Sequence, residues 1–446
     1  MEGRGSLADI ARENFRHDII PPGQNIEDIL VDGYDKVRSL VSDSWLKSRN
    51  NGAHEISRHD LEEPFVMTGG SWVRSASPTM HRFAKALLIT EAYMEDRQDM
   101  VDMHEGALLI GEIAGLSEVI PVLEKKVQNF NSRLEDLSQA PSEEVNAVIH
   151  ELLVAGRAAQ FGRLVEMIPK QPSTSTPDLR LLDTSVPLVI ECKRKDSISE
   201  YHKSEAQVMK ELFLCVEETC RSNGTFGVFF TNFTEMPEDV TPKNFERACM
   251  EAVEEERKPV STNWGKVAYL SGPRRNTIEP TPLYSPYFLR EAFHWSADQP
   301  RFDGIVGRVE NRSEYATDHV EEPLAVQWYT SVESAEDKRA RGVSKLFSKA
   351  CDQVSSSNDM GIVYLCLEDG NRPLLADRRI KYIVEQELHD WEHSARVPNV
   401  NISRLLPRAL GRNEPDLIEN VVETAWSVGD DFRDLIPKRV FTGDLR

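Results

Sequence analysis

The stretch PDLRLLDTSVPLVIECKRK, residues 177–195, decides which fold the chain is expected to adopt. Residues 178–182 read as a short strand, and residues 186–193 read as a longer strand in which an apolar run leads into charged positions. If the two strands pair as a hairpin, the start of the first lies opposite the end of the second. The polar residues at these two places then become neighbours.

Three polar side chains of this hairpin are expected to converge. Side chains alternate along a strand, so Glu191 and Lys193 project from one face while Cys192 packs on the opposite face. Asp178 lies thirteen positions before Glu191, at the mouth of the first strand. In a hairpin, Asp178 can therefore face Glu191.

The flanking sequence predicts a helix before the hairpin and a helix and a strand after it. The first helix begins near Ser142, and Glu151 borders the apolar stripe that is expected to face the sheet, with Glu144 as the reserve candidate. Residues 164–168 read as the first strand, and residues 225–230 as a fully apolar fourth strand. The order α-β-β-β-α-β predicts an α/β sandwich around a short mixed sheet.

The predicted cluster has the chemistry needed to hydrolyse a phosphodiester. Two or three converging carboxylates offer the hard oxygen ligands that Mg²⁺ prefers. A lysine beside them can orient or deprotonate a water and offset the charge that grows on a phosphate.

At this point the sequence resembles the PD-(D/E)XK nuclease superfamily, which has the restriction-endonuclease-like fold. The α-β-β-β-α-β order also looks like the core of that family. The residues that carry the resemblance are Pro177-Asp178, Glu191-Cys192-Lys193 and Glu151, which matches the helical glutamate of many members. The resemblance covers residues 142–232, about a fifth of the chain.

The resemblance implies a nuclease that depends on Mg²⁺ (or Mn²⁺) and acts on nucleic acid, with DNA as the favoured substrate. Asp178, Glu191, Lys193 and Glu151 would be catalytic, and the three carboxylates among them would hold the metal. A role in prokaryotic restriction or anti-phage defence is implied only because such folds often occur there.

Nucleic-acid contacts are expected next to the motif. Arg194 and Lys195 follow it directly, and Gln207 resembles the glutamine found on this helix in recombination-type members. Position 211 holds Glu, where those members usually carry an aromatic residue.

Two other interpretations remain open at this stage. The acidic-x-Lys pattern also occurs at residues 124–126, 256–258 and 336–338, although only the copy at 177–193 has both halves on strands. The chain could be an ordinary α/β domain whose strand ends in a solvated Glu-x-Lys pair. It could also be a catalytically silent nuclease-fold module that acts in binding or assembly.

Composition limits the classes of partner. The 446 residues carry a formal net charge of −21, so the protein is not expected to coat nucleic acid non-specifically. That charge favours a partner protein, such as a second copy in a homodimer, or a tightly gated groove. We expect no transmembrane helix and no secretory signal. The six cysteines are too few for a disulfide scaffold, so a cytoplasmic location is expected.

Four regions are predicted along the chain. Residues 1–140 form a helical domain, 141–235 the nuclease-like core, 236–400 a second α/β unit, and 401–446 a tail with a helix at 415–428. The second unit is marked by strand-like runs and one interrupting helix. The runs are 267–270, 305–309, 324–329 and 362–367, and the helix covers 340–354.

The second unit could be a degenerate repeat of the core. Residues 302–305 parallel 177–180, and residues 323–329 parallel 187–193, which places Gln327 and Tyr329 at the Glu and Lys positions. Such a unit could not balance a divalent cation and would serve binding or assembly. The basic residues proposed for that role are Lys338, Arg339 and Arg341. The simpler interpretation is that these strands are merely another α/β sheet.

Overall fold

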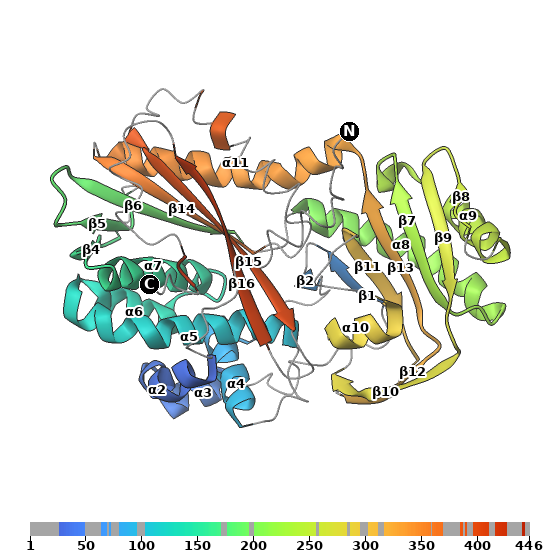
Figure 1. Ribbon diagram of the computed structural model, residues 1–446, viewed down its shortest axis with the longest axis horizontal. Helices are drawn as coiled ribbons and strands as arrows, with labels where there is room; N and C mark the ends of the chain where they lie inside the picture. Colours follow the sequence, from blue (N-terminus) through green and yellow to red (C-terminus); the bar gives the residue numbers. More distant parts are fainter. Residues whose placement is uncertain are drawn as a thin grey trace, which may run out of the picture.

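In the part of the chain that the structure describes, two seven-stranded sheets form the framework of a mixed α/β protein, side by side in Figure 1. The computed structural model describes residues 26–49, 64–68, 71–72, 80–95, 103–170, 176–195, 200–255, 258–282, 286–294, 302–310, 316–357, 359–368, 384–386, 389, 396–409, 415–425 and 439–441.

The first sheet contains the hairpin of residues 177–195, and we call it the hairpin sheet. Its strands in spatial order are β16 (Pro415–Ala425), β15 (Asn399–Ala409), β14 (Met360–Glu368), β6 (Leu188–Lys195), β5 (Leu179–Leu181), β4 (Val165–Met167) and β3 (Val127–Gln128). Strands β4, β5 and β6 pair antiparallel, whereas β14 lies parallel to β6 on its other side. The predicted hairpin is therefore confirmed.

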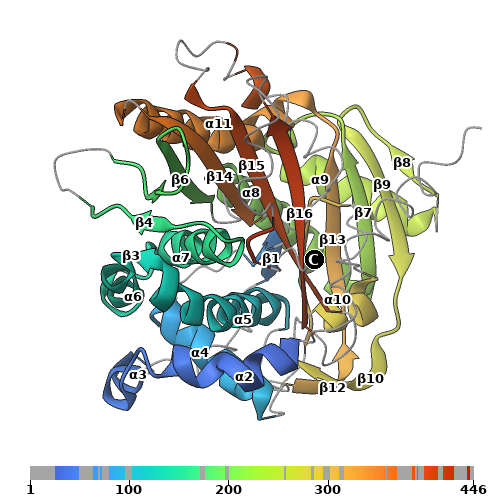
Figure 2. The ribbon, with the colours of Figure 1, turned by 60° about the vertical axis from the view of Figure 1, so that its left-hand side comes forward.

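Helices cover both faces of the hairpin sheet. On one face lie the helices of the N-terminal region and α7 (Figures 1 and 2). They are α2 (Ile26–Arg38), α3 (Asp43–Arg49), α4 (Arg82–Met94), α5 (Met103–Lys126), α6 (Phe130–Gln139) and α7 (Val145–Gln160). The opposite face is covered by α11 (Glu333–Ser356), which packs on β6 and β14. This layering sandwiches the hairpin between α7 and α11.

The second sheet lies on the other side of the molecule (Figure 1). Its strands in spatial order are β2 (Ser71–Trp72), β1 (Phe65–Thr68), β11 (Gly304–Arg308), β13 (Leu324–Thr330), β7 (Gly227–Phe233), β9 (Gly265–Ser271) and β8 (Val260–Ser261). The elements around it are α8 (Glu200–Ser222), α9 (Pro242–Glu254), α10 (Pro286–Phe293), a 3-10 turn at Pro237–Asp239 and the ribbon of β10 (Arg275–Pro282) with β12 (Ala316–Glu321). The four strand-like runs predicted from the sequence are confirmed, and so is the interrupting helix.

Along the described chain the strands pass from one sheet to the other three times, and the crossing after β6 corrects the expected pairing of the fourth strand. β7 does not pair with β6 but lies parallel to β13 in the second sheet, and β14 takes the expected place beside β6. The reason lies in the helices that precede these strands. Phe213 of α8 packs among Phe229 and Trp328 of the second sheet, whereas Phe347 of α11 packs against Val189 of the hairpin sheet.

One further expectation about the regions is wrong. The tail segment predicted as a helix at 415–428 forms β16, which pairs antiparallel with β15 along its whole length. Its β-branched residues favour a strand once such a partner supplies the hydrogen bonds. The described part of the N-terminal region is mostly helical, as expected, although its short strands β1 and β2 belong to the second sheet.

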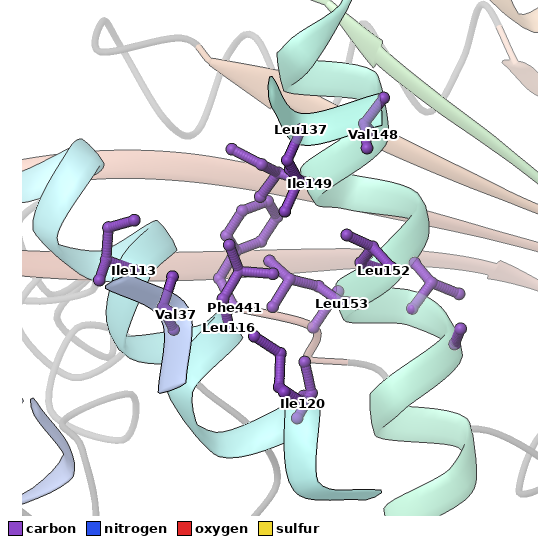
Figure 3. Packing of buried hydrophobic residues seen from close by; sticks show 14 of the residues in the cluster. Val37, Ile113, Leu116, Ile120, Leu137, Val148, Ile149, Leu152, Leu153 and Phe441 are labelled. Carbon is purple, nitrogen blue, oxygen red and sulfur yellow. The ribbon is translucent and has the colours of Figure 1, made fainter. Parts of the chain in front are cut away.

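The core behind the hairpin is built around α5 and α7 (Figure 3). These helices approach closely where Gly156 meets Val119, since a Cβ atom at Gly156 would lie 2.3 Å from Val119 Cβ. Part of α5, Gly106–Lys126, is long and apolar enough to cross a membrane, but 78% of its most apolar window is buried inside the protein. Such burial is typical of the central helix of a folded core. Phe441, near the C-terminus, fills the same core beside Leu153.

Candidate active site

Asp178 is held in place by the backbone of β6. It lies directly before β5, whose first residue Leu179 pairs with Ile190. The Asp178 N–H donates to the Ile190 carbonyl at 3.2 Å, and Asp178 Oδ2 accepts from the Cys192 N–H at 2.9 Å. With only 7% of its surface exposed, the Asp178 carboxylate is fixed next to the backbone of Glu191.

Glu191 and Lys193 form a second fixed pair. The Glu191 carboxylate is fully buried, and Lys193 Nζ forms an ion pair with its Oε1 atom. Cys192 packs into the apolar core on the opposite face with Ile190, which confirms the predicted alternation along β6. The sheet therefore brings Asp178, Glu191 and Lys193 together, as the sequence predicted.

Glu151 reaches this cluster from α7. Its side chain is buried, and Oε2 lies 2.6 Å from Arg133 Nε of α6. Lys170, in the segment after β4, lies 3.8 Å from Glu151 Oε1. The reserve candidate Glu144 is exposed at the start of α7, two helical turns away, so the structure favours Glu151.

Burial raises the pKa values of all three carboxylates, and neighbouring carboxylates add to the shifts of Glu151 and Glu191. Burial, together with the negative charge of Asp178, raises the pKa of Glu151 to about 7 and the pKa of Glu191 well above its usual range. Burial also raises the pKa of Asp178, although Lys193 opposes that shift. The pKa of Lys193 is raised because, against its burial, Glu191 and Asp178 stabilise the ammonium form. Buried carboxylates that repel one another favour the binding of a proton or a cation.

The donor set fits Mg²⁺ by its chemistry. Glu151 Oε2 and Glu191 Oε2 are buried and have no hydrogen-bond partner among the described residues. Oxygen atoms of this kind are the ligands that a hard divalent cation prefers. Within the described ranges, no group of three or more His, Cys, Asp or Glu side chains is already gathered closely enough to hold a metal ion.

We expect the charge on Glu151 to make stability depend on pH. The pKa of Glu151 in the folded state, about 7, lies above the ordinary 4.5. The protonated carboxyl of Glu151 therefore stabilises the fold fully below pH 4.5, and this stabilisation is lost as the pH rises through 7. In the presence of a chelator, the loss between these limits should amount to about 3 kcal/mol. The free energy of unfolding, measured with urea across this pH range, should depend less on pH for Glu151→Gln than for the wild-type protein.

The exposed Glu135 of α6 provides the control for that measurement. Glu135→Gln should keep the pH dependence of the wild-type protein. If Glu151→Gln also keeps it, the carboxyl of Glu151 titrates normally and the interpretation is wrong.

The structure corrects the expectation that Arg194 binds nucleic acid. Its side chain has no exposed surface, because position 194 shares the face of Cys192 and not that of Lys193. Arg194 forms an ion pair with Glu112 of α5, and its Nε atom donates to Glu368 of β14 at 2.7 Å. These charges form a buried network that ties α5 to β6 and β14.

Two other expected nucleic-acid contacts lie outside the carboxylate cluster. Lys195 ends β6, and its side chain approaches Gly342 of α11. Gln207 is exposed on α8, where its amide donates to Glu211 at 2.9 Å. Because α8 packs on the second sheet, nothing places Gln207 against the carboxylates. Both nucleic-acid contacts stay predictions.

The second sheet repeats one detail of the hairpin. The Asp303 N–H donates to the Trp328 carbonyl at 2.6 Å, and Asp303 Oδ2 accepts from the Thr330 N–H at 2.7 Å. This is the hydrogen-bond pattern of Asp178 on β6. It aligns Tyr329 with Glu191, a shift of two residues from the alignment expected from sequence, which paired Gln327 with Glu191.

The basic residues proposed for the second unit are placed only in part. Lys338 Nζ forms an ion pair with Glu238 at 2.9 Å and lies over the ring of Tyr201. The side chains of Arg339 and Arg341 lie outside the described part of the structure. Their binding role stays a prediction.

Sequence reasoning missed the two cations beside Glu151. Arg133 of α6 and Lys170 after β4 lie outside the motif. A local signal exists for Arg133, which lies three residues after Phe130 and four before Leu137, on the apolar face of its helix. The proximity of both cations to Glu151 arises from the packing of α6 against α7 and from the course of the chain after β4.

Comparison of the chain with protein-family models, with curated proteins and with solved structures found no match.

Proposed function

We propose that the protein is a metal-dependent nuclease that hydrolyses phosphodiester bonds, with DNA as the favoured substrate. The observation that carries the proposal is that the hairpin holds the buried Asp178 beside Glu191 and Lys193, while the buried Glu151 of α7 acts electrostatically on Glu191. Two of the carboxylate oxygens lack a hydrogen-bond partner among the described residues. Burying three carboxylates is unfavourable unless a bound cation or a proton offsets their charge, and such clusters often mark functional sites.

The arrangement of elements around the cluster supports the same proposal. The order helix, three strands, helix, strand, on which the resemblance to the PD-(D/E)XK superfamily rests, recurs in space as α7, β4, β5, β6, α11 and β14. The last two elements come from the far part of the chain. This spatial arrangement supports the proposal, and it includes a helix and a strand that the sequence alone had not assigned to the core.

Each residue of the cluster has a role in the proposed reaction. Asp178, Glu191 and Glu151 would hold Mg²⁺ or Mn²⁺, which would supply polarisation of the phosphate. Lys193, held beside Glu191, can orient a water or offset negative charge that develops on the phosphate. The buried position of Glu191 keeps this lysine fixed next to the reacting groups.

A cleavage assay with purified protein tests the proposal. Plasmid, linear duplex and single-stranded substrates should be cut with Mg²⁺ or Mn²⁺ and should stay intact with a chelator, because no metal ion then polarises the phosphate. Cleavage that resists the chelator would point to another site. Binding of these substrates without any cleavage would favour the alternative, a catalytically silent module for binding or assembly.

A further inference from the structure

We propose that Arg133 and Lys170 form a phosphate-binding pair beside the carboxylate cluster and hold the substrate backbone there. The inference rests on the proposed function and names the residues that position its substrate. Neither residue belongs to the sequence motif. They come from separate elements, α6 and the segment after β4, and meet at Glu151.

Arg133 has hydrogen-bonding capacity that its surroundings do not use. The side chain is 4% exposed, and its Nε and Nη2 atoms have no hydrogen-bond partner among the described residues. Nε lies 2.6 Å from Glu151 Oε2, but not in the direction of a hydrogen bond. Nη1 donates to Asp136 at 3.2 Å. A planar guanidinium whose Nε and Nη2 donors make no hydrogen bond among the described residues suits the oxygen atoms of a phosphate.

Lys170 places a solvent-exposed cation near the buried guanidinium of Arg133. Its side chain is 54% exposed, and Nζ lies 3.8 Å from Glu151 Oε1, on the second oxygen of the same carboxylate. A flexible ammonium at this position can meet a phosphate that approaches from outside. The pair therefore offers one exposed cation and one buried cation at the two oxygen atoms of a single carboxylate.

The charge of the site requires such a pair. Phosphates are repelled by the three carboxylates and by the net charge of −21. Arg194 is buried with Glu112 and Glu368. Lys193, which is paired with Glu191, is assigned in the proposed function to the reacting water or phosphate. Arg133 and Lys170 both act electrostatically on Asp178 as well as on Glu151, so they border the cluster as a whole.

The dependence of binding on salt tests the pair directly. Binding of a short fluorescein-labelled DNA duplex is measured by fluorescence anisotropy between about 50 and 200 mM salt. The full-length Asp178→Asn protein in chelator serves as the parent, so that the probe is not cut. Adding Lys170→Ala should lower the slope of log affinity against log salt by about 0.9, the value for one phosphate contact. Lys170→Arg should keep the slope of the parent.

Matched variants separate this role from a structural one. Lys36 is exposed on α2, and Lys36→Ala should leave both slope and affinity unchanged. Arg133→Lys should keep more affinity than Arg133→Met, with thermal unfolding used to confirm that both variants are folded. Because Lys170 is exposed, the test does not depend on the Arg133 variants folding.

The outcomes distinguish this inference from the proposed function. If the wild-type protein cleaves DNA but Lys170→Ala keeps the slope of the parent, the phosphate-binding pair is wrong and the nuclease proposal stands. If Lys170→Ala lowers the slope but the wild-type protein never cleaves, the pair stands and hydrolysis is wrong. A wild-type protein that neither binds nor cleaves the duplex overturns both.

Discussion

Asp178→Asn is expected to reduce the rate of metal-dependent DNA cleavage by at least about 100-fold. Enzymes that lose a single group that stabilises the transition state typically show an effect of this size. Asn is close to Asp in size and can still accept the hydrogen bond from the Cys192 N–H at 2.9 Å. The substitution therefore removes one negative charge from the cluster while it keeps the hairpin geometry. The measurement is initial cleavage rate at saturating Mg²⁺, with circular dichroism to confirm the fold.

Lys193 gives an independent test of the same site. Lys193→Ala should abolish cleavage as well, since it removes the ammonium that is paired with Glu191. The two variants should differ in metal dependence, because Asp178 is a proposed metal ligand and Lys193 is not. Raising the Mg²⁺ or Mn²⁺ concentration should restore part of the rate of Asp178→Asn and none of the rate of Lys193→Ala.

Asp303 supplies the matched control for Asp178. It has the same hydrogen-bond pattern in the second sheet but no acidic-x-Lys pair beside it. Asp303→Asn should leave the cleavage rate unchanged. Full activity of either purified hairpin variant, Asp178→Asn or Lys193→Ala, would falsify the site.

The second large effect concerns stability and not catalysis. Arg194→Met is expected to lower the free energy of unfolding by about 3–5 kcal/mol, the usual loss when one partner of a buried ion pair is removed. Glu112 and Glu368 would keep buried negative charges without their main partner. Burial would otherwise raise the pKa of Glu112, but Arg194 and Arg82 hold it below its usual range.

Urea unfolding of matched variants checks this expectation. Arg274 is 77% exposed and pairs with Glu322, so Arg274→Met should cost less than about 1 kcal/mol. Adding Glu112→Gln and Glu368→Gln to Arg194→Met neutralises the two carboxylates that lost their partner. These substitutions should recover part of the free energy of unfolding that Arg194→Met loses. Equal stability of Arg194→Met and the wild-type protein would show that the buried network does not stabilise the fold.

The sequence alone determined the local parts of the candidate site. Alternation along β6 separated Glu191 and Lys193 from Cys192, and the antiparallel pairing of β5 with β6 brought Asp178 to them. These relations depend on neighbouring residues and on one short connection, so the residue pattern is enough to predict them. The same alternation also places Arg194 on the buried face of Cys192, a consequence that the expectation of a nucleic-acid contact overlooked.

Only the tertiary structure decided which helix and strand complete the hairpin sheet. Helices α8 and α11 are both amphipathic, and both lead into apolar strands, so local pattern cannot tell which strand pairs with β6. The choice rests on packing between residues far apart in sequence, such as Phe347 of α11 against Val189 of β6. Arg133 and Lys170 reach Glu151 for the same reason, because the packing of α6 and α7 and the course of β4 bring them there. Contacts of this kind depend on the whole fold, and no short stretch of the sequence specifies them.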